Sequence, residues 1–273
     1  MRFVCAADCG VDRYDDRDVE RAGGIGLNVA VHARLACAPR DSVTALAPVG
    51  DDHGADVVRD ALAHARVEPC LEIVRGATPV QHIRHTSDGE RLFTRYDEGV
   101  LAGFRVSARQ AAAIAAGDVL ATAAFGQALT FFESVMAARS GGLCAVDFTN
   151  ANDVGDPVAF VERWAPELDV GIFGLQRSDA ALIDALEAIA RRSDRLFVVT
   201  LGPAGALALS GGPRIVRPAL PVAQVIDTTG AGDAFTAGFL CEYVRSGSAE
   251  LALARGIEVA AATLGHLGSF ERR

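Results

Sequence analysis

The segment Asp227-Thr228-Thr229-Gly230-Ala231-Gly232-Asp233 holds the residues of this 273-residue chain that are best suited to chemistry. An apolar pattern from Thr236 to Val244 predicts a helix just after it. The first amides of a helix have no intrahelical acceptor, and the helix dipole adds partial positive charge there. Because glycine brings no side chain to block an anion, Gly230, Ala231 and Gly232 predict a phosphate-binding turn.

Asp233 lies where that turn meets the predicted helix. Its carboxylate can accept a proton from a substrate hydroxyl, while the amides of residues 231 to 233 stabilise charge on a transferring phosphoryl group. The structural alternative is a helix cap at Asp233. A cap accounts for one aspartate, but not for two glycines, two threonines and a second aspartate in this order.

The basic residues exclude several mechanisms, because all 26 are arginine and none is lysine. A Walker A loop, a protein-kinase lobe and a Schiff-base enzyme each need a lysine. Phosphate must therefore be bound by amides, arginine or a metal. The net charge of −9 argues against nucleic acid and against an anionic membrane as partners.

The cysteines show no metal-ligand spacing, which predicts reduced, partly buried thiols. They are Cys5, Cys9, Cys37, Cys70, Cys144 and Cys241. The start of the chain reaches Asp8 after too few apolar residues for a signal peptide. No window approaches the roughly 20 apolar residues of a membrane span. We therefore expect a cytoplasmic protein.

Apolar strands alternate with amphipathic helices along most of the chain, which predicts a mostly parallel, doubly wound α/β sheet. The strands are expected at residues 3–7, 42–46, 118–121, 143–146, 170–173 and 196–201. Helices are expected at residues 27–36, 158–164 and 179–191. Two more are expected, one from the turn at residues 50–54 to about residue 65 and one that begins after the cap Ser107.

Between residues 71 and 97 the pattern changes to short segments. Val80–His85 and Arg91–Tyr96 flank Ser87-Asp88-Gly89-Glu90, which predicts a hairpin that projects from the main sheet. We expect a solvated outer face for most of its charged residues. These are His82, Arg84, His85, Arg91 and Arg95.

Two motifs resemble the signatures of the ribokinase-type (PfkB) sugar kinases. Asp227 to Asp233, continued by Ala237-Gly238-Phe239-Leu240, resembles the C-terminal signature. Gly23-Gly24-Ile25-Gly26-Leu27-Asn28-Val29-Ala30 resembles the core of the N-terminal one, although Cys37 replaces a later glycine. The resemblance extends from Phe3 to Gly268. It implies one ribokinase-like domain over residues 1–273, with a three-layer α/β/α core and a small β-sheet lid formed by about 9–20 and 71–97.

The resemblance also implies roles for individual residues. Asp233 is the implied catalytic base, and Gly230, Ala231 and Gly232 form the implied anion hole. The implied substrate-binding residues are Asp8, Asp12, Gly23, Gly24 and Asn28, and Arg95 is a further candidate because its charge could meet that of a substrate. The implied nucleotide-binding residues are Thr200, Leu201, Gly202, Gly205 and Thr228. ATP and Mg²⁺ are the implied cofactors, with room for K⁺ near Asp227 and Thr229.

Some of these residues have structural alternatives, and one motif departs from the family. Asp12 can belong to an acidic run with Asp15, Asp16 and Asp18 on a wet face, and Gly23-Gly24 can be a helix-entry turn. Many family members carry Asn-x-x-Glu, which helps to organise the magnesium waters, where this chain has Gly174-Leu175-Gln176-Arg177. Asp179 lies nearby and is a candidate to compensate.

Within the family, several segments resemble the subgroup that phosphorylates fructosamines, the fructoselysine 6-kinases. They are Arg95–Val100, Ala123–Gly126, Asp147–Thr149 and Ala261–Gly268. We therefore expect ATP-dependent phosphorylation of a primary hydroxyl of a sugar or sugar amine, with fructoselysine or a related fructosamine as substrate. The charges of such a substrate would meet acidic lid residues and Arg84, Arg91 or Arg95.

Of four alternatives to a fructosamine kinase, two stay open, and particular residues argue against the other two. Fructokinase, ribokinase and nucleoside kinase activities share the same anion hole. A sugar- or nucleotide-binding regulator fits the altered Gly174–Arg177 motif, although Asp233 argues against it. A dinucleotide site at Gly24-Ile25-Gly26 is disfavoured because Val29 replaces its third glycine. His82 and His85 fall on opposite faces of a strand, which disfavours a metal hydrolase.

A homodimer through the lid is also expected.

Overall fold

Nine strands form the main sheet of the computed structural model, which describes residues 1–85, 91–149 and 154–271. Their order is β13-β12-β11-β10-β9-β8-β1-β4-β5, and all neighbours from β5 to β11 pair in parallel, whereas β12 and β13 are antiparallel. The strands are β1 Arg2–Ala6, β4 Ser42–Val49, β5 Glu68–Ile73, β8 Val119–Ala123, β9 Leu143–Asp147, β10 Val170–Gly174, β11 Leu196–Thr200, β12 Ala206–Leu209 and β13 Ile215–Arg217.

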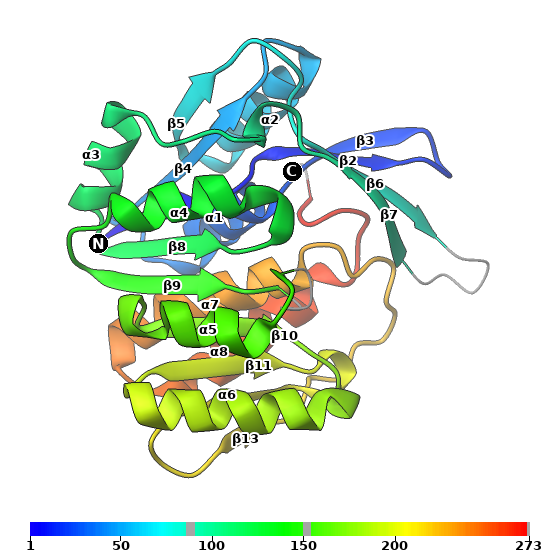
Figure 1. Ribbon diagram of the computed structural model, residues 1–273. Helices are drawn as coiled ribbons and strands as arrows, with labels where there is room; N and C mark the ends of the chain where they lie inside the picture. The colour runs from blue at the N-terminus through cyan, green and yellow to red at the C-terminus, as the bar shows by residue number, and fades with distance from the viewer. Residues whose placement is uncertain (86–90, 150–153, 272–273) are drawn as a thin grey trace.

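Helices cover both faces of this sheet, as Figure 1 shows. One layer contains α1 (Ile25–Ala36), α2 (His53–Ala65), α7 (Ala231–Ser246) and α8 (Ala249–Thr263). The other contains α3 (Ala108–Ala116), α4 (Leu129–Ala137), α5 (Pro157–Trp164) and α6 (Ala180–Ser193). Successive strand residues point to opposite faces, so Phe3 and Cys5 join the first core while Val4 and Ala6 join the second. The predicted three-layer α/β/α fold is confirmed.

Helix α7 begins five residues earlier than the apolar pattern predicts, at Ala231. Gly230 precedes it with φ +75°, a left-handed conformation that glycine adopts without steric cost. A Cβ at residue 230 would also overlap the side chain of Ser269. Asp233 therefore lies inside the first turn of α7, where the helix dipole acts on it most strongly.

A second sheet of order β3-β2-β6-β7 projects from the edge at which the parallel strands end (Figure 1). Its strands are β2 Gly10–Tyr14, β3 Val19–Gly23, β6 Val80–His85 and β7 Arg91–Asp97. The predicted hairpin strands are present, and their predicted turn at residues 87–90 lies outside the described residues. The lid range predicted from residue 71 begins too early, because β5 pairs with β4 in the main sheet.

The structure corrects the prediction for two cysteines. Cys37, just after α1, and Cys241, within α7, form a disulfide with a Cα–Cα distance of 5.5 Å. A separation of 204 residues leaves no local sequence pattern that could predict this pair. Cys5, Cys9, Cys70 and Cys144 are buried free thiols, as expected. No helix within the described residues is long and apolar enough to cross a membrane.

The disulfide predicts a thiol count. In denaturant without reductant, four cysteines per chain should react with a thiol reagent, and all six should react after reduction. Reduction should lower the free energy of unfolding by about 2–5 kcal/mol, because the cross-link restricts the unfolded chain. A Cys37→Ser variant is the matched control, since reductant should leave its stability unchanged. Six reactive thiols in the unreduced protein would contradict the bond.

Candidate active site

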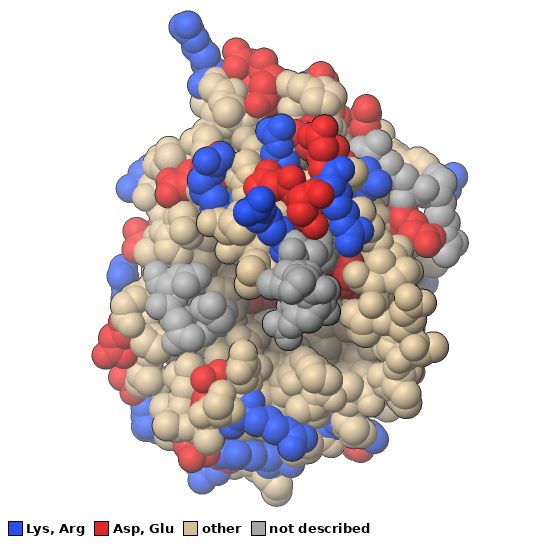
Figure 2. All heavy atoms as spheres, turned by 90° about the vertical axis from the view of Figure 1, so that its right-hand side faces the viewer, with Lys and Arg blue, Asp and Glu red and all other residues tan. Residues whose placement is uncertain are grey.

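A cavity of about 530 Å³ opens between the carboxyl ends of the parallel strands and the four-stranded sheet. Ligands of open α/β sheets bind at this edge. Figure 2 looks onto that side of the molecule and shows charged side chains of both signs gathered over a hollow. Four carboxylates line the cavity, those of Asp8, Asp12, Asp147 and Asp233, and Arg95 is the only basic side chain among its described lining residues.

Asp8 follows β1 and lies at the start of α1. Its Oδ1 accepts a hydrogen bond from the amide of Ile25 at 3.0 Å, and its Oδ2 accepts one from the hydroxyl of Tyr96 at 3.2 Å. The side chain is 4% exposed. Burial raises the pKa of Asp8 to about 6, against the opposing effect of these hydrogen bonds.

Asp12 lies on β2 and is buried, which separates it from the exposed acidic run at Asp15, Asp16 and Asp18. A side chain at Gly23 on β3 would overlap its carboxyl group. Gly24 caps α1 with φ +94°, and a Cβ there would approach the Asp8 carbonyl at 2.6 Å. Gly23 and Gly24 therefore lead the chain into α1, and their lack of side chains leaves room for Asp12 and Asp8 beside the start of this helix.

Asn28 and Asp233 join helix α1 to helix α7. The amide Nδ2 of Asn28 donates to Oδ2 of Asp233 at 2.8 Å. Its Oδ1 is buried and has no hydrogen-bond partner among the residues that the structure describes, so it can accept from a ligand hydroxyl. Burial raises the pKa of Asp233 well above its usual value, and the charges of Asp147, Asp8 and Asp12 raise it further against the bond from Asn28.

The predicted anion-binding turn lies at the floor of the cavity. Gly230 and Gly232 line it, and a Cβ at Gly232 would meet no atom within 4 Å. The amide of Ala231 donates to the carbonyl of Thr228 at 3.2 Å and does not line the cavity. The amides of Gly232 and Asp233, in the first turn of α7, are the ones suited to receive an anion.

The implied nucleotide residues divide into two groups. Thr200, at the end of β11, and Thr228 line the cavity. Leu201, Gly202 and Gly205 form the turn between β11 and β12 and lie outside its lining. Gly202 faces open space, since a Cβ there would meet no atom within 4 Å.

The segment that replaces the Asn-x-x-Glu motif brings no acidic side chain to the cavity. Gly174 lines the cavity with its backbone, and Leu175 is buried. Asp179 accepts from the amide of Gln176 at 2.8 Å in a capping arrangement before α6. Asp179 is not among the described residues that line the cavity, so the structure gives no support to its suggested role in place of the glutamate.

The second sheet supplies the opposite wall. Arg95 on β7 donates to Oδ2 of Asp97 at 2.8 Å, lies 2.9 Å from Nε2 of His82, and has 63% of its side chain exposed. His82 is buried and also contacts Asp15, so the prediction of a solvated face is wrong for it. Tyr96 packs edge-on against Phe125 at 5.7 Å, which gives the cavity an aromatic corner.

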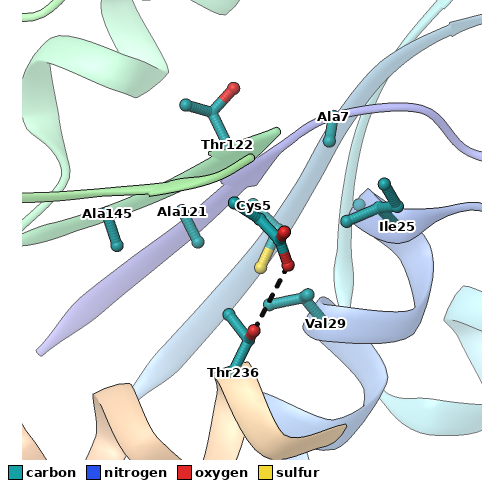
Figure 3. Close-up of a pocket in the computed structure, with 10 residues that line it drawn as sticks. Cys5, Ala7, Ile25, Val29, Ala121, Thr122, Ala145 and Thr236 are labelled. Carbon is teal, nitrogen blue, oxygen red and sulfur yellow. Dashed lines mark hydrogen bonds between the residues drawn. The ribbon is translucent and has the colours of Figure 1, made fainter. Parts of the chain in front are cut away.

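Asp147 is a site residue to which sequence reasoning assigned no role. It ends β9, its Oδ1 accepts from the amide of Thr149 at 2.7 Å, and its Oδ2 accepts from Oγ1 of Thr236 at 3.4 Å. Figure 3 draws this last bond as the dashed line from Thr236, and both residues line a small, largely apolar pocket of about 10 Å³. Burial beside these groups raises the pKa of Asp147 to about 6.

The raised pKa of Asp147 predicts a pH-dependent gain in stability for Asp147→Asn. A carboxyl whose pKa is higher in the folded state loses its stabilising contribution as the pH rises through about 6. The free energy of unfolding of the variant should be about 1–3 kcal/mol higher than that of wild type at pH 8. At pH 4 the two free energies should be equal. Urea unfolding at both pH values measures this.

Asp118→Asn is the matched control. The hydrogen bond from the Arg2 amide holds the pKa of exposed Asp118 below its usual value, so this variant should not gain stability at pH 8. A stability change at Asp147 that is the same at both pH values would refute the assignment of a costly buried charge.

The structure therefore gathers most of the predicted site residues at one cavity. Those that line it are Asp8, Asp12, Gly24, Asn28, Arg95, Thr200, Thr228, Gly230, Gly232 and Asp233. Gly23, Leu201, Gly202, Gly205 and Ala231 are predicted residues outside the lining. The residues missed include Gln81, Tyr96, Phe125, Gln127 and Asp147. Position at the carboxyl end of a strand was the available signal for Asp147.

Comparison with known proteins agrees with this architecture. The model of the pfkB family carbohydrate kinases matches residues 164–271. The chain is 32% identical over 260 residues to the fructoselysine 6-kinase of Shigella flexneri, covering 95% of this chain and 96% of the relative. It is 26% identical over 275 residues to a fructosamine kinase of Bacillus subtilis, covering 99% and 93%. The adenosine kinase of Sinorhizobium meliloti shares the fold, with a TM-score of 0.81, 21% identity and coverage of 99% and 95%.

The fold is that of the ribokinase-like α/β proteins. The chain belongs to the pfkB family of carbohydrate kinases, and it is an ATP-dependent carbohydrate kinase.

Proposed function

We propose that this kinase transfers the γ-phosphoryl group of ATP to the primary hydroxyl of fructoselysine or a related fructosamine. The observation that carries the proposal is the charge of the cavity, four carboxylates against one arginine, in a chain 32% identical to a fructoselysine 6-kinase. A sugar amine brings an ammonium group, which lowers the cost of burying several carboxylates together. A neutral sugar brings no such charge.

Asp233 is the proposed general base. It takes the proton of the attacking hydroxyl as the oxygen bonds to the γ-phosphorus and the bond to the ADP oxygen breaks. The bond from Asn28 fixes its carboxylate in the first turn of α7. The amides of Gly232 and Asp233 stabilise the charge on the transferred group.

The sugar is proposed to lie between Asp8, Asp12 and Asn28, which can accept several hydroxyl protons at once. Tyr96 and Phe125 supply an apolar wall on the side of the second sheet. That sheet is proposed to act as a lid, because it places β7 across the cavity from α7. The homodimer through this sheet remains a prediction.

Magnesium is proposed to arrive with ATP. Among the described residues, no group of three or more His, Cys, Asp or Glu side chains is arranged to hold a metal. Mg²⁺ in phosphoryl-transfer sites typically uses one or two carboxylates together with substrate phosphates and water. Asp147 fits that requirement, since it supplies carboxylate oxygens near Asp233 and forms no ion pair with an arginine of the described residues. The ion would neutralise charge on the phosphates.

A substrate panel tests the proposal. We expect ADP release with ATP and Mg²⁺ to be fastest, by kcat/KM, with fructoselysine or a simpler fructosamine, and slower with fructose, ribose and adenosine. The reason is the missing ammonium group in the neutral sugars. Highest turnover on fructose, ribose or adenosine would overturn the substrate assignment but leave the kinase. No turnover on any member, with ATP still bound, would favour the regulator.

An Arg95→Gln variant tests the carboxylate of fructoselysine separately from its ammonium groups within the same assay. Its KM for fructoselysine should rise about 10-fold, because a charge-assisted hydrogen bond to the substrate carboxylate is lost. Its KM for a fructosamine made from a simple alkylamine should stay unchanged. Arg13→Gln on β2, outside the cavity lining, is the control. An unchanged KM for fructoselysine in Arg95→Gln, or the same fold-change in KM for both substrates, would refute the proposed contact.

A further inference from the structure

The carboxylate of Asp227, in the turn before α7, accepts four hydrogen bonds. Oδ1 accepts from the amide of Thr229 at 2.9 Å and from its hydroxyl at 2.7 Å. Oδ2 accepts from the hydroxyl of Tyr14 at 2.7 Å and from the amide of Gly268 at 2.9 Å. A carboxylate has about four lone-pair sites, so these donors occupy all of them. Burial alone would raise the pKa of Asp227, but these donors lower it below its usual value.

Tyr14 is the donor that comes from the second sheet. It ends β2 and is fully buried, 213 residues before Asp227. Its hydroxyl oxygen also lies 3.2 Å from Oγ1 of Thr229. Burial raises the pKa of Tyr14 above its usual value, so its hydroxyl keeps the proton that it donates. The sheet across the cavity is thus tied to the turn that begins the anion-binding helix.

The family resemblance places a monovalent cation near Asp227 and Thr229, and the residues present do not fit one. A cation needs oxygen atoms with free lone pairs, whereas the lone pairs of Asp227 are taken by N–H and O–H donors. The Thr229 hydroxyl directs its proton at Asp227. The site is built for hydrogen bonds instead.

We propose that Tyr14 is a positioning residue that holds the Asp227–Gly230 turn through its hydroxyl, and that this kinase therefore works without a monovalent cation. The turn sets the left-handed conformation of Gly230 and so the direction of the first amides of α7. Tyr14 does not touch the reacting atoms. Its effect should appear in the rate of phosphoryl transfer more than in the binding of sugar.

Two measurements on wild type test the cation part. Rates in KCl, NaCl and tetramethylammonium chloride at equal ionic strength should agree within about 2-fold. The unfolding temperature, which any ion bound only to the folded state would raise, should be the same in KCl and in tetramethylammonium chloride. An unfolding temperature several degrees higher in KCl, or a rate increase of about 10-fold or more, would overturn the proposal.

Tyr14→Phe tests the positioning part and removes one hydroxyl from a buried ring. Its kcat should fall about 10-fold with the KM for sugar within about 2-fold, less than the 100-fold typical when an anion-hole donor itself is lost. Tyr243→Phe, in the last turn of α7, is the matched control and should keep the wild-type kcat. An unchanged kcat for Tyr14→Phe would refute the role. A drop confined to KM would refute it as well.

The readouts also separate this inference from the proposed substrate. They can be taken with whichever sugar of the panel is turned over, because the turn serves the phosphoryl group. For a protein that turns over none of them, the affinity for ADP replaces the rate. Wild type should then bind ADP equally in the three salts, whereas tighter binding in KCl would overturn the cation part.

Discussion

The site depends on confining negative charge. Asp8, Asp12, Asp147 and Asp233 line one cavity, and burial raises the pKa of three of them, Asp8, Asp147 and Asp233. This arrangement costs stability in the free protein. In the proposed function, a metal bound to the nucleotide and the ammonium group of the substrate would each bring positive charge that offsets this repulsion.

The fold accounts for how these groups meet. Asp8 follows β1 and Asp147 ends β9 at one edge of the sheet, and Asn28 and Asp233 lie in the first turns of α1 and α7. The Asn28–Asp233 bond and the Cys37–Cys241 disulfide link the same two helices at both ends of their contact. Tyr14 then ties the second sheet to the turn before α7. Position and charge are thus set by the core rather than by surface loops.

The sequence predicts the parts of this arrangement that are local. The strand and helix periods predict six of the nine strands of the main sheet but not β5, β12 or β13, and the Gly230–Asp233 motif predicts a helix start. The sequence does not predict long-range pairs of residues. Nothing near Cys37 indicates that it bonds to Cys241, and nothing near Tyr14 indicates that it donates to Asp227. The predicted lid range begins too early, at residue 71, for a similar reason, since pairing with β4 decides which sheet β5 joins. Asp147 has a strand-end position but no motif.

The most direct test of the account is the turnover of Asp233→Asn. Asparagine keeps an acceptor for Asn28 but cannot take a proton, so kcat should fall about 10²–10⁴-fold while the protein stays folded and binds ATP. Asp179→Asn, which alters an aspartate outside the cavity, should retain wild-type kcat. An Asp233→Asn enzyme within about 3-fold of wild type would contradict the central role given to this carboxylate.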